Sequence, residues 1–230
     1  MFETLIDFDR ELLLAVNGSD SLFLDRMVRM LTNGLTWIPL YLSLFYMVMK
    51  NNDNFRKILF ILGAAGLCVL LAGTVDDVIV KPTVARWRPT HDPEIGMLVD
   101  VVNDYRGGNY GFFSSHAANT IAVTTFFAII VRSKRLFIAL FSWYLLSVWS
   151  RLYLGQHFLT DIAVGTMWGI VSAIIACYVY VKVYAKVTEK KAFISEQYTT
   201  TGFALSDINI IVTVFLLTCI AAMICGPFMQ

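Results

Sequence analysis

Long apolar runs alternate with short polar segments along most of this chain. A helix that crosses a bilayer needs roughly 20 consecutive apolar residues, and six runs after residue 30 approach this length. They cover residues 31–49, 58–80, 112–131, 136–154, 158–181 and 208–228. The pattern therefore predicts an all-α fold, a polytopic integral membrane bundle with six transmembrane helices in residues 31–230.

Residues 1–30 follow a different pattern. Apolar residues such as Leu5, Leu12 and Val16 alternate with acids, and Asn17-Gly18 interrupts the run. Neither half is long enough to span a bilayer, so we expect two short helices that lie along the membrane interface. Charged residues also crowd the first eleven positions, where a signal peptide has its apolar core. We therefore expect no cleavable signal peptide and a mature protein that comprises the whole chain.

The composition supports a membrane location. Of 230 residues, 57% are hydrophobic and only 15% are charged, whereas about 25% of the residues in soluble domains are charged. The net charge of +1 and the lack of a basic stripe argue against nucleic acid as a partner. All the cysteines fall inside predicted spans without CxxC spacing, so we interpret them as packing residues. They are Cys68, Cys177, Cys219 and Cys225.

The loop charges give a predicted orientation. Six spans would place the N-terminus, the loop 80–111, the turn at Gly155 and the C-terminus on one side. The other side would carry Lys50, Arg56, Lys57, Arg132, Lys134, Arg135, Lys182, Lys186, Lys190 and Lys191. The first side carries Arg10, Arg26, Arg29, Lys81, Arg86, Arg88, Arg106 and Arg151. Some basic residues of the first side could bind an anionic substrate and would then say nothing about topology. The positive-inside rule in that case places the side with Lys50 and Arg132 in the cytoplasm.

Three polar clusters gather on the predicted outer side. They are KPTVARWRP at 81–89, FSSHAANT at 113–120 and SRLYLGQHFLTD at 150–161. Ionisable residues at the ends of membrane spans are costly to place and suggest function by default. Because all three clusters face the same side, we expect them to form one site.

The first two clusters have groups that suit a phosphate. Lys81 and Arg88 are seven residues apart and could aim at one dianion, although basic residues at span ends are more often solvated or paired with lipid headgroups. Ser114 and Ser115 look like the N-cap and first turn of a helix, which offers free N–H groups to an anion. His116 would then stand beside the bound group, although a lone histidine at a helix start is more often a capping residue.

The third cluster suggests nucleophilic catalysis. His157 and Asp161 are four residues apart, so on a helix the carboxylate could orient the ring and leave one nitrogen as an exposed nucleophile. Arg151 could complete a cationic cradle. The alternative is a purely structural His–Asp pair at a helix cap.

Together the clusters resemble the signature of the type-2 phosphatidic acid phosphatase family, which includes vanadium-dependent haloperoxidases. That signature reads K-x6-R-P, P-S-G-H and S-R-x5-H-x3-D. The first and third elements match at every fixed position: Lys81, Arg88, Pro89, Ser150, Arg151, His157 and Asp161. The second departs twice, with Phe113 in place of proline and Ser115 in place of glycine.

The resemblance implies a role for each matching residue. His157 would be the nucleophile that forms a phosphohistidine, Asp161 would orient it, and His116 would be the general acid. The implied phosphate ligands are Lys81, Arg88, Ser114, Ser115 and Arg151. The resemblance implies no metal or other cofactor, and we interpret Asp76-Asp77, the nearest candidate for a metal site, as polar packing residues.

The predicted function is therefore a metal-independent lipid phosphatase in the inner membrane, with its site on the extracytoplasmic side and a phosphorylated membrane lipid as its partner. We favour undecaprenyl pyrophosphate as the substrate, with phosphatidylglycerophosphate or lipid A, and a phosphotransferase reaction, as alternatives. The six spans exclude the soluble haloperoxidase branch. A transporter is a remote alternative, because charges gather at one surface and no internal repeat is visible. The oligomeric state stays open.

Overall fold

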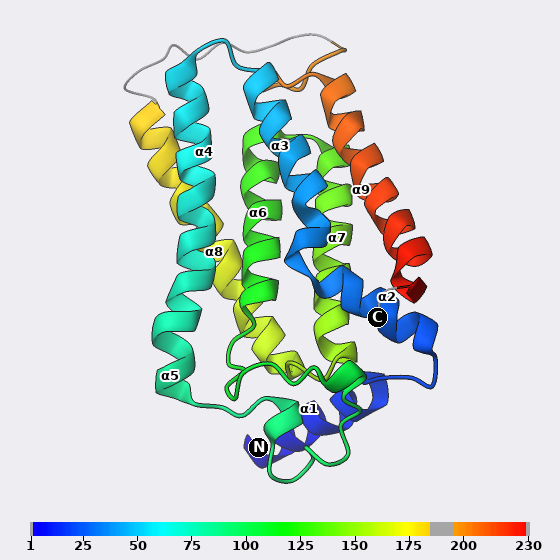
Figure 1. Cartoon of the computed structure of the whole chain (residues 1–230). Coiled ribbons are helices and arrows are strands. Elements are labelled where there is room, and N and C mark those ends of the chain that lie inside the picture. The colour runs from blue at the N-terminus through cyan, green and yellow to red at the C-terminus, as the bar shows by residue number, and fades with distance from the viewer. Residues whose placement is uncertain (1, 185–195, 229–230) are drawn as a thin grey trace.

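The fold is a bundle of helices. The computed structural model describes residues 2–184 and 196–228, and this part of the chain contains helices and no strands (Figure 1). The α-helices are α1 (Phe2–Val16), α2 (Leu22–Thr32), α3 (Ile38–Lys50), α4 (Phe55–Val69), α5 (Lys81–Val84), α6 (Ser115–Val131), α7 (Lys134–Tyr153), α8 (Leu159–Tyr184) and α9 (Leu205–Cys225). The all-α prediction is confirmed.

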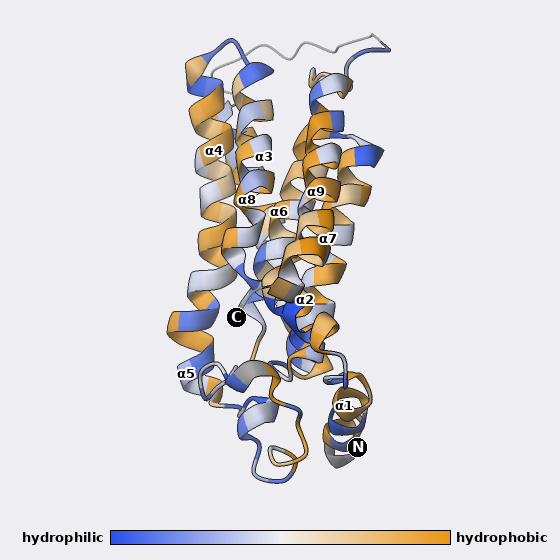
Figure 2. Cartoon of the chain, turned by 45° about the vertical axis from the view of Figure 1, so that its right-hand side comes forward, coloured by the Kyte–Doolittle hydropathy of each residue, from blue (hydrophilic) through white to orange (hydrophobic). Residues whose placement is uncertain are grey.

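The long helices stand side by side, and the other elements collect at one end. α3, α4, α6, α7, α8 and α9 run along the bundle, while α1, α5 and the segment 85–114 lie at its lower end in Figure 1. Apolar residues cover the sides of the upright helices, and hydrophilic residues concentrate towards the ends (Figure 2). This distribution is typical of a membrane bundle.

Four helical stretches in the described chain are long and apolar enough to cross a membrane. They are Phe55–Val84, Lys134–Tyr153, Leu159–Tyr184 and Leu205–Cys225. α6 has 17 residues and α3 has 13. The run predicted at 31–49 is divided, because Asn33 ends α2 and caps a 3-10 turn, Gly34–Trp37, before α3 starts. Six spans therefore stay a prediction.

The stretch Phe55–Val84 is one long helix with two π-helical segments. They are Leu70–Thr74 and Asp76–Val80. A π turn contains more residues per turn than an α-helix and often marks a functional site. The helix ends at Ala85, which has a left-handed φ of 49°. Lys81 therefore lies in the last turn, at the lower end of the bundle.

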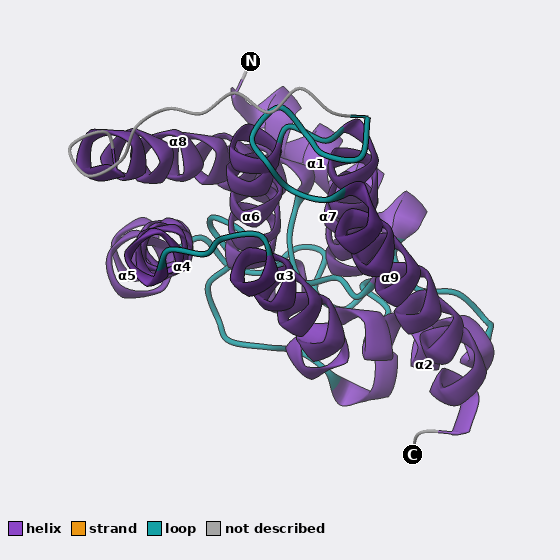
Figure 3. Cartoon of the chain, turned by 90° about the horizontal axis from the view of Figure 1, so that it is seen from above, coloured by secondary structure: helices purple, strands orange, loops and turns teal. Residues whose placement is uncertain are grey.

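α6 lies at the centre of the bundle, flanked by α4, α7 and α8 (Figure 3). Gly165 and Gly169 of α8, spaced as G-x-x-x-G, allow this helix to approach α6 closely. A Cβ atom at Gly165 would lie 2.6 Å from the carbonyl oxygen of Ser114. The backbone N–H of Ser114 donates to the Asp161 carbonyl over 3.1 Å. This close contact brings the second and third polar clusters together.

The N-terminal helices close the same end of the bundle. α1 packs against α7 and α8, and α2 packs against α7 and α9. Side chains of Asp9 and Leu13 on α1 are buried, so this helix binds the bundle through one face. The location of α1 and α2 at the membrane interface stays a prediction.

Candidate active site

The three polar clusters converge at the lower end of the bundle. Arg88 Nη1 lies 3.2 Å from His157 Nε2, which joins the first cluster to the third. Lys81 Nζ lies 2.6 Å from Ser115 Oγ, which joins the first to the second. The charges of Arg151, His157, Lys81 and Arg88 all lie close enough to act on His116. The structure thus brings the eight predicted site residues into one neighbourhood.

His157 lies in the turn between α7 and α8 and is buried. Its Nδ1 is 2.8 Å from the carbonyl oxygen of Gly111. A carbonyl only accepts and a guanidinium only donates, so Nδ1 carries the proton and Nε2 offers its lone pair to Arg88. This is the tautomer that a nucleophilic Nε2 requires.

Asp161 does not hold the ring directly, contrary to the expected orienting role. Its Oδ2 is 3.8 Å from His157 Nδ1 and accepts a hydrogen bond of 3.0 Å from the Phe158 backbone N–H. Its Oδ1 lies 2.6 Å from Arg86 Nη1. The reason is that α8 begins at Leu159, so His157 precedes the helix and the four-residue spacing does not place the two side chains on one helical face.

Arg86 and Asp9 are site neighbours that the sequence reasoning missed. Arg86 Nη2 lies 2.8 Å from Asp9 Oδ2, so this arginine bridges Asp9 on α1 and Asp161 on α8. The backbone N–H of Thr160 also donates to Asp9, over 3.1 Å. One signal was available: Asp9 is four residues from both Leu5 and Leu13, on the apolar face of α1. A carboxylate on that face needs a buried partner.

Lys81 and Ser115 have protein partners of their own. Lys81 Nζ lies 2.8 Å from Asp76 Oδ2 and also pairs with Asp77. Ser115 Oγ lies 2.8 Å from Asp76 Oδ2, and the buried Asp76 also accepts from the Phe113 backbone N–H. Asp76 thus has the polar packing role expected for it. Phosphate binding by Lys81 and Ser115 stays a prediction.

Ser114 and His116 lie where the sequence predicted. Ser114 is the N-cap of α6, and its hydroxyl accepts from the Ala117 backbone N–H over 3.4 Å. His116 follows in the first turn and is half-buried. The helix start therefore faces the site beside His157, with its positive dipole end nearby.

Arg88 and Arg151 supply positive charge without a carboxylate partner in the described part of the chain. Arg151 is 2% exposed and donates to Thr32 Oγ1 over 2.7 Å, while Arg88 donates to the Gln156 carbonyl over 3.1 Å. Burial is the main cause that holds the pKa of His157 well below its ordinary value, and the positive charges of Arg88 and Arg151 add to it. A neutral, nucleophilic imidazole results.

The described residues contain no cluster of acids, histidines and cysteines of the kind that holds a metal ion. Within residues 2–184 and 196–228, no group of three or more of these side chains could hold a metal ion. The carboxylates near the site, Asp9, Asp76, Asp77 and Asp161, are all engaged by Lys81 or Arg86.

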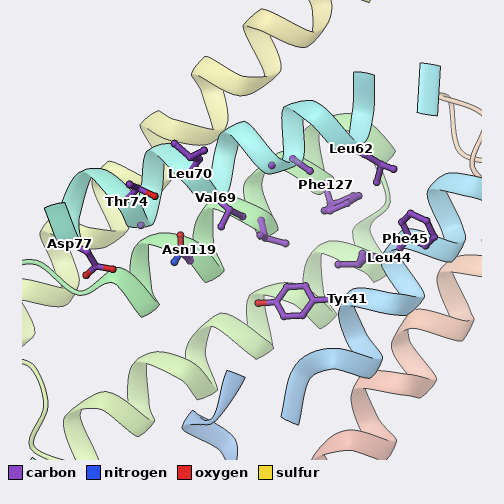
Figure 4. A pocket seen from close by; sticks show the side chains of 14 residues that line it. Tyr41, Leu44, Phe45, Leu62, Val69, Leu70, Thr74, Asp77, Asn119 and Phe127 are labelled. Atoms are coloured by element: carbon purple, nitrogen blue, oxygen red, sulfur yellow. The ribbon is translucent and has the colours of Figure 1, made fainter. Parts of the chain in front are cut away.

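An apolar groove of about 640 Å³ ends beside Asp77, a partner of Lys81. It runs between α3, α4 and α6 (Figure 4). Apolar side chains such as Tyr41, Leu62 and Phe127 line most of its length. Asp77 and Asn119 form its polar end, and Asp77 pairs with Lys81. The groove therefore connects an apolar passage with the cationic end of the bundle.

Comparison with known proteins gives the chain its family. The profile of the PAP2 superfamily matches residues 40–185. The lipid A 4'-phosphatase of Porphyromonas gingivalis is 34% identical over 182 residues, which cover 79% of this chain and 75% of the relative. The lipid A 4'-phosphatase of Bacteroides thetaiotaomicron is 36% identical over 171 residues, which cover 74% of this chain and 75% of the relative. No solved structure matches the chain significantly. The resemblance seen in the motifs is confirmed, and the chain belongs to the PAP2 superfamily as a membrane lipid phosphatase of that type.

Proposed function

We propose that this protein removes a phosphate group from lipid A by nucleophilic attack of His157. The motifs alone favoured undecaprenyl pyrophosphate, but the relatives that share 34% and 36% identity carry the name lipid A 4'-phosphatase. The observation that supports the chemistry best is the environment of His157. Its Nδ1 is fixed by the Gly111 carbonyl, and its Nε2 faces the cationic group of Arg88.

In the first step, the incoming phosphate takes over the Arg88 donor and frees the Nε2 lone pair. Nε2 attacks the phosphorus in line, a P–N bond forms, and the bond to the sugar oxygen breaks. His116 donates a proton to the departing oxygen. The hydrogen bond from Nδ1 to Gly111 stabilises the positive charge that the ring acquires, and Arg88 and Arg151 stabilise the charge on the phosphoryl oxygens.

In the second step, water attacks the phosphohistidine. His116 accepts a proton from this water, the P–N bond breaks, and inorganic phosphate leaves while His157 becomes neutral again. Asp161 acts from a distance in both steps, because it fixes Arg86 and the Phe158 backbone beside the nucleophile.

The groove suits a substrate with acyl chains. Its polar end shares Asp77 with Lys81, so a phosphate at the site and an acyl chain between α3, α4 and α6 can belong to one molecule. The phosphate would then be at the membrane surface while the chain stays at membrane depth. We infer an inner-membrane protein whose site faces the extracytoplasmic side.

Undecaprenyl pyrophosphate is the second candidate substrate. The observation in its favour is a third arginine near Arg88 and Arg151, because Arg29 also has no carboxylate partner among the described residues. A diphosphate carries more negative charge than a monophosphate and would suit such a site.

Phosphate release by the purified protein tests the proposal. Lipid A, undecaprenyl pyrophosphate and phosphatidylglycerophosphate are assayed in detergent with excess EDTA, for the native chain, His157→Ala and the matched histidine control His91→Ala. We expect fastest release from lipid A, a loss of at least about 10³-fold in His157→Ala, and activity near the native level in His91→Ala. Release that persists without His157 would refute the mechanism, and faster release from undecaprenyl pyrophosphate would reverse the order of substrates.

A further inference from the structure

Three arginines from separate parts of the chain surround Tyr105. The Arg29 guanidinium carbon lies 3.7 Å from the centre of the Tyr105 ring, and that of Arg151 lies 5.8 Å from it. Arg88 is close enough for its charge to act on the Tyr105 phenol. Arg88 and Arg151 belong to the family signature. Arg29 does not, because it comes from α2.

Charge compensation sets these arginines apart from the other cations of the site. Arg86 pairs with carboxylates of Asp9 and Asp161. By contrast, the described residues provide no carboxylate partner for Arg29, Arg88 or Arg151. Like charges this close repel one another, so such a cluster favours an anion among them.

Each of the three arginines also has an unused donor. Arg29 Nη1, Arg88 Nε and Arg151 Nε are buried and have no hydrogen-bond acceptor in the part of the chain that the structure describes. A buried donor without an acceptor destabilises a protein, because it has lost its hydrogen bond to water. Two structural roles of Arg29 do not explain its unpaired Nη1. Arg29 stacks on Tyr105 and lies in the last turn of α2, where a positive charge is favourable, but neither role requires a buried N–H group without an acceptor.

The cluster also changes the properties of Tyr105. Burial alone would raise the pKa of its phenol. The arginines, of which Arg151 acts most strongly, outweigh burial and leave this pKa below its ordinary value. The arginines thus make ionisation of the Tyr105 phenol easier than burial alone would allow.

The number of charges indicates what Arg29 binds. Lys81 is already compensated by Asp76 and Asp77, so Arg88 and Arg151 match the two negative charges of one phosphoryl group. Arg29 adds a third positive charge, which the same phosphoryl group would leave without a negative partner. We propose that Arg29, supported by Tyr105, forms a second anion subsite that binds a negatively charged headgroup substituent, a phosphoryl or a carboxylate, next to the phosphoryl that reacts. This inference rests on the proposed function, because it assigns the reacting phosphoryl to Arg88 and Arg151.

Equilibrium binding of two probes tests the subsite without turnover. Orthophosphate has one phosphoryl group and pyrophosphate has two, and isothermal titration in detergent measures both on full-length protein with the His157→Ala change. Arg29→Gln and Arg29→Lys are added to this background. Arg26→Gln, one turn earlier on α2, is the matched control. A wrong assignment of the phosphatase activity would show in the release assay, because titration does not depend on catalysis.

We expect the parent protein to bind pyrophosphate more tightly than orthophosphate. Arg29→Gln should weaken pyrophosphate binding about ten-fold or more, the effect of one lost charge-assisted hydrogen bond, and change orthophosphate binding less than about three-fold. Arg29→Lys should lie between the two, and Arg26→Gln should match the parent. Equal loss for both probes would overturn the second subsite and assign Arg29 to the reacting phosphoryl. No loss for either probe would make Arg29 a structural residue.

Discussion

At the scale of single residues, the proposed nucleophile His157 is oriented by a backbone contact. The i, i+4 spacing of His157 and Asp161 indicated a carboxylate orienter, but the Gly111 carbonyl is the direct partner of Nδ1. A neutral acceptor fixes the tautomer without attracting a second proton to the ring. His157 can therefore stay neutral although Arg88 and Arg151 lie close to it.

This environment makes a prediction about protonation. The pKa of His157 lies well below its ordinary value of about 6.5, because of burial and then of Arg88. The ring should stay neutral as the pH falls through 6.5, whereas the unfolded chain binds a proton there, so His157 contributes a loss of folding stability below that pH. NMR of ¹³Cε1-labelled histidine in detergent measures this titration, with the signal assigned by its loss in His157→Ala. A midpoint at or above 6.5 would contradict the prediction.

At the scale of elements, the groove depends on small residues along one helix. Gly66 of α4 lines the groove, and a Cβ atom there would meet no other atom within 4 Å. Gly63, one turn earlier on the same helix, is also exposed with open space at its Cβ position, but it does not line the groove. The two glycines thus allow a test of the groove with a matched change of volume.

Gly66→Phe should fill the groove and displace an acyl chain. An acyl chain excluded from the groove would lose apolar contacts worth about 1.5–3 kcal/mol, which corresponds to a rise in KM of about ten-fold or more for a lipid substrate. Phosphate release from soluble p-nitrophenyl phosphate should not change, because the phosphate site is untouched. Gly63→Phe should leave both reactions as they are. An equal effect of the two variants on KM would mean that no acyl chain binds between α3, α4 and α6.

At the scale of the whole molecule, the cations divide between the two ends of the bundle. Arg86, Arg88 and Arg151 belong to the site at the lower end. The opposite end carries Lys50, Arg56, Lys57, Arg132, Lys134, Arg135 and Lys182 near helix ends. Lys186, Lys190 and Lys191, which we also counted for this end, lie outside the described residues. If the site arginines bind phosphate as proposed, the positive-inside rule predicts that the opposite end faces the cytoplasm.

Labelling of single cysteines tests this orientation. In a chain without Cys68, Cys177, Cys219 and Cys225, Met97→Cys marks the site end, where Met97 is 96% exposed. Asp53→Cys marks the other end in an exposed turn. A maleimide that cannot cross membranes should label Met97→Cys in intact spheroplasts and Asp53→Cys only after permeabilisation. The reverse result would place the site in the cytoplasm.

The sequence by itself determined the helical membrane fold, the family and the positions of the residues that we propose for the site. Apolar runs of bilayer length leave a helix as the way to satisfy backbone hydrogen bonds. The spacing of Lys81, Arg88, Arg151 and His157 predicts phosphoryl chemistry, because the role proposed for each of these side chains is to act directly on the phosphate. We did not predict that Asn33 and Gly34 divide the first apolar run. Hydropathy is averaged over many residues, so two polar or small residues in an apolar run change it little.

Only the tertiary structure decided which partners support those residues. The Gly111 carbonyl on His157, Asp9 on Arg86 and Arg29 over Tyr105 join positions 46, 77 and 76 residues apart. No periodic pattern links such distant positions, because their contact depends on how α1, α2 and the segment 85–114 fold over the end of the bundle. The residues proposed for catalysis can thus be predicted from local motifs. Their orientation and the surplus positive charge arise from packing between elements that are remote in the sequence.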